Sequence, residues 1–163
     1  MIFLTVGTLF PFDRLVRAVD TAVGKGLIEE DVFAQIGQSR FKPKNIRYVE
    51  LLQKAVFDHY VENASSLISH AGIGTIAMAL SQDKPLLVMP RMKRYKEHVN
   101  DHQVATAKKF EHLGHILAAY EVGELPGKIE QLRTFVPRKR EVQPQRVVER
   151  IAQFLNELSV IKK

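Results

Sequence analysis

Short apolar runs alternate along this chain with segments in which apolar residues recur every three or four positions. The runs predict strands over residues 2–6, 32–36, 46–49, 66–69, 85–89 and 116–118. The longer spacing predicts helices over residues 12–23, 51–60, 73–81, 100–113, 122–135 and 144–158, with an interruption near Pro126. We expect the final helix to turn an apolar face inward, made of Val147, Ile151, Phe154, Leu155 and Leu158.

The order of these elements predicts an α/β fold, a Rossmann-like parallel sheet with helices on both faces. The strands lack a clean alternation of apolar and polar residues, which is typical of strands buried on both sides. In such sheets, ligands bind beyond the carboxyl ends of the strands. The informative segments are therefore the loops at residues 7–10, 37–39, 70–74 and 90–102.

Length and composition narrow the class of protein. The 163 residues suit a single domain over residues 1–163. The chain contains no cysteine, which excludes disulfides and thiolate metal sites. No apolar run approaches the roughly 20 residues that a spanning helix needs, and the first residues do not form a signal peptide. We therefore expect a cytoplasmic protein, recruited to the inner face of the membrane by a partner.

A glycine-rich turn follows the strand over residues 66–69. Residues 70–75, with the sequence HAGIGT, lead directly into the next helix. Glycines let the backbone approach a ligand closely, and a helix start presents unpaired N–H groups with a partial positive charge. A phosphate placed there meets both, with His70 placed to donate to one oxygen and Thr75 to cap the helix or reach another. The alternative is a tight strand-to-helix turn without a ligand.

A dinucleotide site is a second interpretation of the same turn. Gly72, Gly74 and Ala77 match the G-x-G-x-x-G/A fingerprint, and Arg91 lies near the place of an NADP-binding arginine. That fingerprint should follow the first strand of its unit, whereas the first strand here ends at Gly7 without it. No acidic residue ends the fifth strand to bind a ribose. An NAD(P)-binding oxidoreductase is therefore the less favoured alternative.

Several stretches occur in the order and at the spacing of one enzyme family: VGT…PFDRLVRAVD, FAQIG, LISHAGIGTIAMAL, KPLLVMPR and YKEHVNDHQ. From residue 2 to about residue 116, the chain resembles the C-terminal, donor-binding domain of GT-B glycosyltransferases of family 28. It is most similar to a short stand-alone form, the catalytic subunit of two-part UDP-sugar transferases. These build dolichol-linked oligosaccharide, and bacterial counterparts act in capsule and exopolysaccharide synthesis.

The resemblance implies an inverting transferase that moves a sugar from a UDP-sugar to a lipid-linked acceptor, without a further cofactor or a metal. A separate, membrane-anchored subunit would hold the acceptor, so no residue of this chain is assigned as the general base. The implied donor-binding residues lie on the loops named above: Gly7, Thr8, His70, Gly72, Gly74, Thr75, Arg91, Asn100, His102 and Gln103. The first six would face the diphosphate, Arg91 would neutralise it, and the last three would bind the sugar.

One position departs from the family pattern. Many relatives carry an acidic, ribose-binding residue in the helix after the turn, and Met78 stands there in this chain. Other groups must then hold the ribose. The departure keeps open another class of function, a non-catalytic accessory subunit that enhances a partner glycosyltransferase.

Two histidines suggest an alternative chemistry. His98 and His102 lie four residues apart, with Glu97 and Asp101 beside them, a spacing that can bind zinc on a helix. The segment is not the HExxH pattern, and the sequence offers no evident third ligand. A sugar contact by His102 and a loop role for His98 are therefore favoured over a metal site.

The remaining features concern possible partners. Leu9 and Phe10 form an apolar loop after the first strand, which either contacts a partner protein or packs locally. A net charge of +6 favours anionic partners, and basic residues gather at 91–96 and 138–140. Solvated surface charge is the simplest interpretation of these clusters. They lack the aromatic patterning of RNA-binding modules, so no nucleic-acid partner is expected.

Overall fold

The computed structural model describes residues 1–139 and 144–161, and within these ranges six parallel strands form one sheet in the order β3-β2-β1-β4-β5-β6. The strands are β1 Ile2–Thr5, β2 Val32–Gln35, β3 Arg47–Val49, β4 Ser66–His70, β5 Leu86–Met89 and β6 Leu117–Ala118. The helices are α1 Asp13–Gly24, α2 Lys54–Asn63, α3 Ile73–Ser81, α4 His102–His112, α5 Leu125–Leu132 and α6 Pro144–Ile161. Two short 3-10 turns, η1 Lys93–Tyr95 and η2 Val122–Glu124, complete the described elements.

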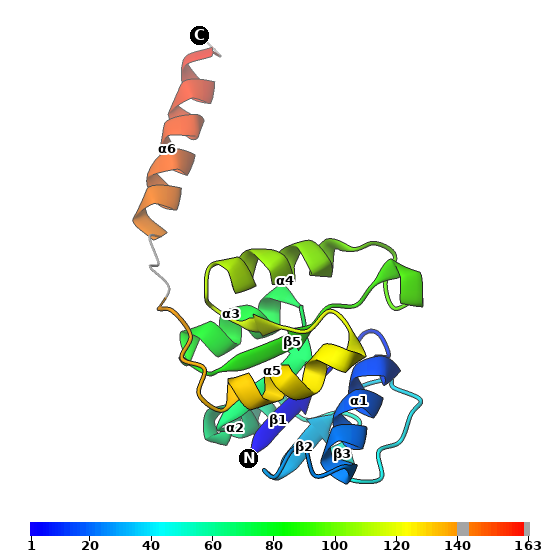
Figure 1. The fold of residues 1–163 in the computed structure, drawn as a ribbon. Helices are drawn as coiled ribbons and strands as arrows, with labels where there is room; N and C mark the ends of the chain where they lie inside the picture. Colours follow the sequence, from blue (N-terminus) through cyan, green and yellow to red (C-terminus); the bar gives the residue numbers. More distant parts are fainter. Residues whose placement is uncertain (140–143, 162–163) are drawn as a thin grey trace.

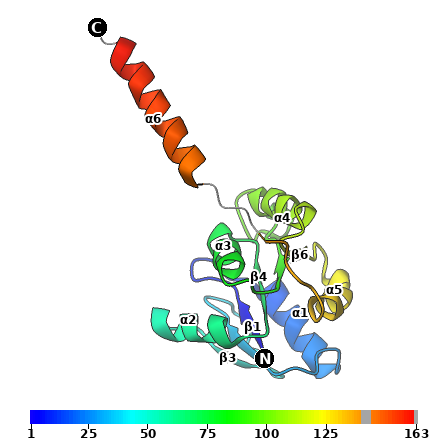
Figure 2. The same ribbon diagram turned by 90° about the vertical axis from the view of Figure 1, so that its left-hand side faces the viewer.

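Helices cover both faces of the sheet (Figures 1 and 2), which confirms the predicted α/β class. Along β1, Ile2 and Leu4 join the core formed with α1 and α5. Phe3, between them, joins the core formed with α2, α3 and α4. All four residues of β1 are buried. A strand enclosed on both sides has no polar face, and this explains the continuous apolar runs in the sequence.

The centre of the sheet is where the strand order reverses. β1 pairs with β2 on one side and with β4 on the other, so Thr5 is in register with both Gln35 and Ser69. The chain leaves all three strands at the same edge of the sheet. The loops that follow β1, β2 and β4 therefore meet at this switch point, where parallel sheets bind ligands.

One difference from the sequence prediction has a local cause. α2 begins at Lys54 rather than at residue 51, because the preceding segment is tied to β2. The Leu52 N–H donates to Gln35 Oε1 at 3.3 Å, and the Glu50 carbonyl accepts the Gly37 N–H at 2.9 Å. The expected break in the fifth helix is confirmed, since η2 precedes α5 and a proline occupies the first turn of α5.

The prediction that the final helix turns its apolar face inward is wrong. α6 projects from the sheet domain (Figures 1 and 2). Ile151, Phe154 and Leu155 expose 55%, 50% and 58% of their surface, while Val147 and Leu158 lie outside the described side chains. An amphipathic pattern shows that a helix has an apolar face, but not which surface covers it. No helix in the described residues has the length and apolar character needed to cross a membrane.

Candidate functional site

A pocket of about 290 Å³ lies between the loop after β1, the end of β4, the loop after β5 and the start of α4. Its walls are Val6, Gly7, Thr8, Leu9, Phe10, His70, Arg91, His98 and Gln103. Gly7, Thr8, His70, Arg91 and Gln103 are residues that the sequence singled out, and they come from the loop after β1, the end of β4, the loop after β5 and the start of α4. The structure therefore brings half of the predicted donor site into one hollow at the switch point of the sheet.

The glycines of the site make room for the ring of His70. A β-carbon at Gly7 would lie 3.0 Å from His70 Cε1, and one at Gly72 would overlap His70 Nε2. A β-carbon at Gly37 would overlap the Gly7 carbonyl oxygen. Gly7 and Gly37 also adopt positive φ angles of 75° and 54°, which glycine tolerates. These three glycines let the loops after β1, β2 and β4 approach one another around a single imidazole.

His70 is neutral at pH 7. Burial, reinforced by the nearby Arg91 charge, lowers its pKa to about 4. Ser69 Oγ donates to the Thr5 carbonyl at 2.7 Å and lies 3.2 Å from His70 Nδ1. Because the serine proton is used for the carbonyl, this network assigns the imidazole proton to Nδ1, which donates to Ser69 Oγ. Nε2 beside Gly72 is then an acceptor, and it becomes a phosphate donor only when a ligand's negative charge raises the pKa.

The start of α3 lies beside the His70 ring and is a second possible binding point for an anion. Gly72 is the N-cap, in extended geometry, and no side chain caps the helix within the described residues. Of the two roles considered for Thr75, the cap is therefore wrong, because Thr75 lies inside the first turn of the helix; the contact with a second phosphate oxygen stays a prediction. A β-carbon at Gly74 would meet nothing within 4 Å. The first-turn N–H groups of a helix have no intrahelical partner, and this is the arrangement that binds phosphates at helix starts.

The predicted sugar-binding residues divide into two sets. Gln103, at the start of α4, is 4% exposed, and its Oε1 accepts the Arg91 backbone N–H at 3.1 Å. Asn100 and His102 are exposed and do not line the pocket; Asn100 Oδ1 accepts the His102 N–H at 3.2 Å. The His102 ring lies 4.5 Å from that of His98, which does line the pocket. Only Gln103 of the three reaches the hollow itself.

The acidic neighbours of the two histidines are engaged elsewhere. Glu97 accepts two hydrogen bonds from Arg14, at 2.8 and 2.9 Å, and Asp101 accepts the Lys93 N–H at 2.8 Å. In the part of the chain that the structure describes, no three His, Asp or Glu side chains are placed to hold a metal ion. The pKa of His98 is lowered, chiefly by burial and next by the charge of His102.

Two arginines were not recognisable from the sequence as parts of one network. Arg91, expected among solvated charges, is 3% exposed and donates through Nη2 to the carbonyls of Val6 and Phe10, each at 2.7 Å. Burial lowers its pKa to about 10, so it stays charged at neutral pH. The buried ring of Phe12 lies between Arg91, at 4.8 Å, and Arg14, at 5.4 Å. Residues this far apart in the chain leave no local signal of such a contact.

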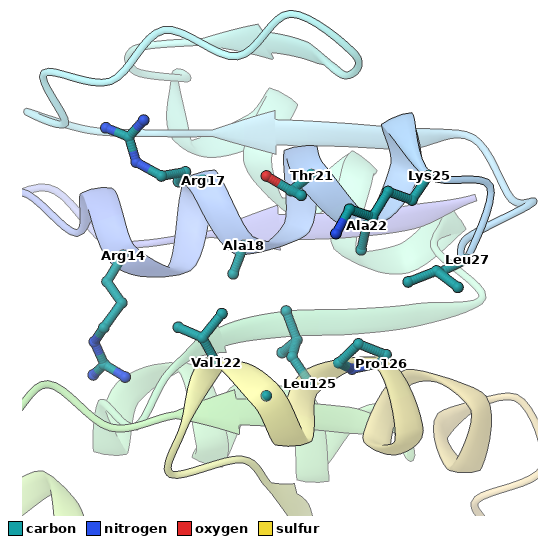
Figure 3. Close-up of a pocket in the computed structure, with 11 residues that line it drawn as sticks. Arg14, Arg17, Ala18, Thr21, Ala22, Lys25, Leu27, Val122, Leu125 and Pro126 are labelled. Carbon is teal, nitrogen blue, oxygen red and sulfur yellow. The ribbon is translucent and has the colours of Figure 1, made fainter.

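A second hollow, of about 550 Å³, lies between α1 and the η2–α5 segment. Ala18 and Ala22 face Val122 and Leu125 across it (Figure 3). None of the predicted donor-binding residues lines this groove. It is therefore a separate surface feature on the α1 and α5 face of the sheet.

Comparison with known proteins gives one family and several relatives. The model of the glycosyltransferase family 28 C-terminal domain matches residues 1–158. The UDP-N-acetylglucosamine transferase subunit ALG13 of Eremothecium gossypii is 40% identical over 68 residues, which cover 41% of this chain and 32% of that protein. The matched region thus spans about a third of the relative's length.

Solved structures with a similar fold include that of a glycosyltransferase and that of an ALG13 protein. SnogD, a glycosyltransferase from Streptomyces nogalater, superimposes with a TM-score of 0.59 and 19% identity, over 82% of this chain and 34% of its own. An NMR solution structure of ALG13 superimposes with a TM-score of 0.56 and 19% identity, over 88% of this chain and 91% of its own. At these identities the likeness concerns the fold.

Proposed function

This chain belongs to the glycosyltransferase family 28 C-terminal domains, and on that premise we propose that it is the donor-binding, catalytic subunit of an inverting glycosyltransferase. It moves a sugar from a UDP-sugar to a lipid-linked acceptor in polysaccharide or glycan synthesis. The observation that carries the proposal is the anion cradle at the switch point of the sheet. There His70 lines the pocket together with the Gly7–Phe10 loop, and its ring lies directly beside Gly72, the N-cap of α3.

The cradle suits a diphosphate that leaves with growing negative charge. Gly7 and Thr8 line the pocket with His70, and the first turn of α3, whose N–H groups have no intrahelical partner, begins next to the same ring. Fixed dipoles and a buried guanidinium stabilise charge that develops in the transition state, because they need no reorganisation. His70 takes up a proton as the diphosphate arrives and then donates to it through Nε2.

The sugar lies toward the start of α4 in this proposal. Gln103 Oε1 is occupied by the Arg91 N–H, so its amide group is left to donate to a sugar hydroxyl. Asn100 and His102 are exposed beside His98 and contact the sugar once a partner closes the cleft. This arrangement makes Gln103 the residue on which discrimination among UDP-sugars depends most.

A second, membrane-anchored subunit supplies the acceptor and the general base. Leu9 exposes 76% and Phe10 45% of its surface at the mouth of the pocket, where an apolar contact excludes water from the reaction. The word "subunit" in the name of the Eremothecium relative supports a divided enzyme. The partner holds this chain at the inner face of the membrane, in the cytoplasm.

The proposal is tested by binding and by transfer. Calorimetry should detect UDP binding to the chain, and transfer should require the partner. His70→Ala and Gln103→Ala should abolish transfer while the protein stays folded. His112→Ala and Gln131→Ala are matched controls, because both side chains are exposed and lie outside the pocket. Full activity of both site variants with the partner present contradicts the site assignment.

A non-catalytic accessory subunit remains the second candidate, and one observation favours it. Met78, at the family's ribose position, packs against the core beneath α3 and offers no acceptor. If neither the chain nor its complex binds UDP or UDP-sugars by calorimetry, while the complex still shows enhanced transfer by the partner, the accessory function replaces the catalytic one.

A further inference from the structure

Arg91 holds the first glycine loop at both of its ends. Its Nη2 donates to the Val6 carbonyl, which precedes the loop, and to the Phe10 carbonyl, which ends it, each at 2.7 Å. Its Nε donates to the Pro11 carbonyl at 3.4 Å. Between these anchors lie Gly7 and Thr8, the residues that face the bound diphosphate in the proposed function. The position of that loop therefore depends on one planar side chain.

The same residue orients the polar side chain that faces the sugar. The Arg91 N–H donates to Gln103 Oε1 at 3.1 Å inside a buried environment. This bond determines which end of the carboxamide faces inward, and it leaves the amide hydrogens for a ligand. Arg91 thus links the loop after β1 to the start of α4, across β4 and β5.

The surroundings hold the guanidinium plane in place. The ring of Phe12 lies 4.8 Å from the Arg91 guanidinium carbon and is completely buried. Arg14 donates to the Pro90 carbonyl at 2.8 Å and forms an ion pair with Glu97. The residue before Arg91 is therefore also held. A lysine ammonium at this position carries the same charge, but it lacks the rigid fork that bridges two carbonyls.

We propose that Arg91 is a positioning residue of the donor site, which acts by setting the Gly7–Phe10 loop and the Gln103 amide rather than by contacting the diphosphate directly. The proposal rests on the proposed donor-binding function. The proposal attributes the effect of Arg91 to its geometry and not to its charge. Nε and Nη2 donate to backbone carbonyls. Only the remaining nitrogen and the overall charge are left to act on a ligand.

The test compares Arg91→Lys, which keeps the charge, with Arg91→Met, which removes it. A positioning role predicts that both variants weaken UDP binding by about tenfold or more, the effect of losing one charge-assisted hydrogen bond. In the ligand-free protein, both should also shift the amide NMR signals of residues 7–10 and of the Gln103 side chain. Lys109→Met, which removes an exposed charge on α4, should do neither.

Wild-type UDP affinity in Arg91→Lys together with a loss in Arg91→Met overturns the proposal, because charge alone would then suffice. Unshifted signals of residues 7–10 in both variants overturn it as well. If Arg91→Met fails to fold, Arg91→Lys alone still separates the two outcomes. If the wild-type chain does not bind UDP, the proposed function fails, while the ligand-free NMR comparison still decides whether Arg91 sets the loop.

Discussion

The neutral His70 makes the free energy of unfolding depend on pH. Its pKa is about 4 in the folded chain, against an ordinary value of 6.5. At pH 7 the imidazole is neutral in both states. As the pH falls below 6.5, the unfolded chain binds a proton that the folded chain does not accept, so stability is lost. Below about pH 4 both states are protonated, and the loss levels off.

The size of the effect follows from the gap between the two pKa values. One pH unit is worth about 1.4 kcal/mol, so the whole gap amounts to about 3 kcal/mol. About 2 kcal/mol of it should be lost between about pH 7 and about pH 5. Other titrating groups also make the free energy of unfolding depend on pH. The quantity to compare is therefore the pH dependence of the wild type minus that of a variant without the imidazole. His70→Asn removes the imidazole and should remove this part of the slope.

Urea unfolding at the two pH values measures the prediction. The wild type should lose about 2 kcal/mol more than His70→Asn on going from about pH 7 to about pH 5. His112→Asn, which removes an exposed histidine of α4, should behave like the wild type. Equal losses in the wild type and in His70→Asn would show that the folded chain does not lower the pKa of His70, and would refute the buried, neutral imidazole.

Three further predictions concern glycine space, a buried ion pair and the last helix. Gly72→Ala should displace the imidazole beside it, which should cost about 2 kcal/mol in chemical unfolding and also lower UDP affinity, whereas Gly127→Ala, in α5 with open space around it, should change neither. Arg14→Met should cost about 3 kcal/mol, because it leaves the mostly buried Glu97 carboxylate unpaired; adding Glu97→Gln should restore part of that loss in a double-mutant cycle. Phe154→Asp, at a half-exposed position of α6, should change the free energy of unfolding of the sheet domain by less than about 0.5 kcal/mol.

Much of the donor site was predictable because its chemistry is local. The HAGIGT segment joins a buried strand to a helix, and this alone places His70 and Gly72 at an anion-binding turn. The helix over residues 73–81 was predicted correctly, and a residue inside its first turn cannot be the N-cap, so the cap role considered for Thr75 was already inconsistent with that boundary. The protonation of His70 was not predictable, since it depends on Ser69, Thr5 and the Arg91 charge together.

The sequence by itself determined the strands, the helices, their parallel arrangement and the glycine turn. These follow from apolar periodicity and from backbone freedom over a few neighbouring residues. Only the tertiary structure decided that Arg91 is buried and bridges the Val6 and Phe10 carbonyls, and that Arg14 pairs with Glu97, 83 residues away. It also decided that Ile151, Phe154 and Leu155 of α6 are left uncovered. Charge and amphipathicity state what a side chain needs, whereas the folding of distant segments determines which partner meets that need.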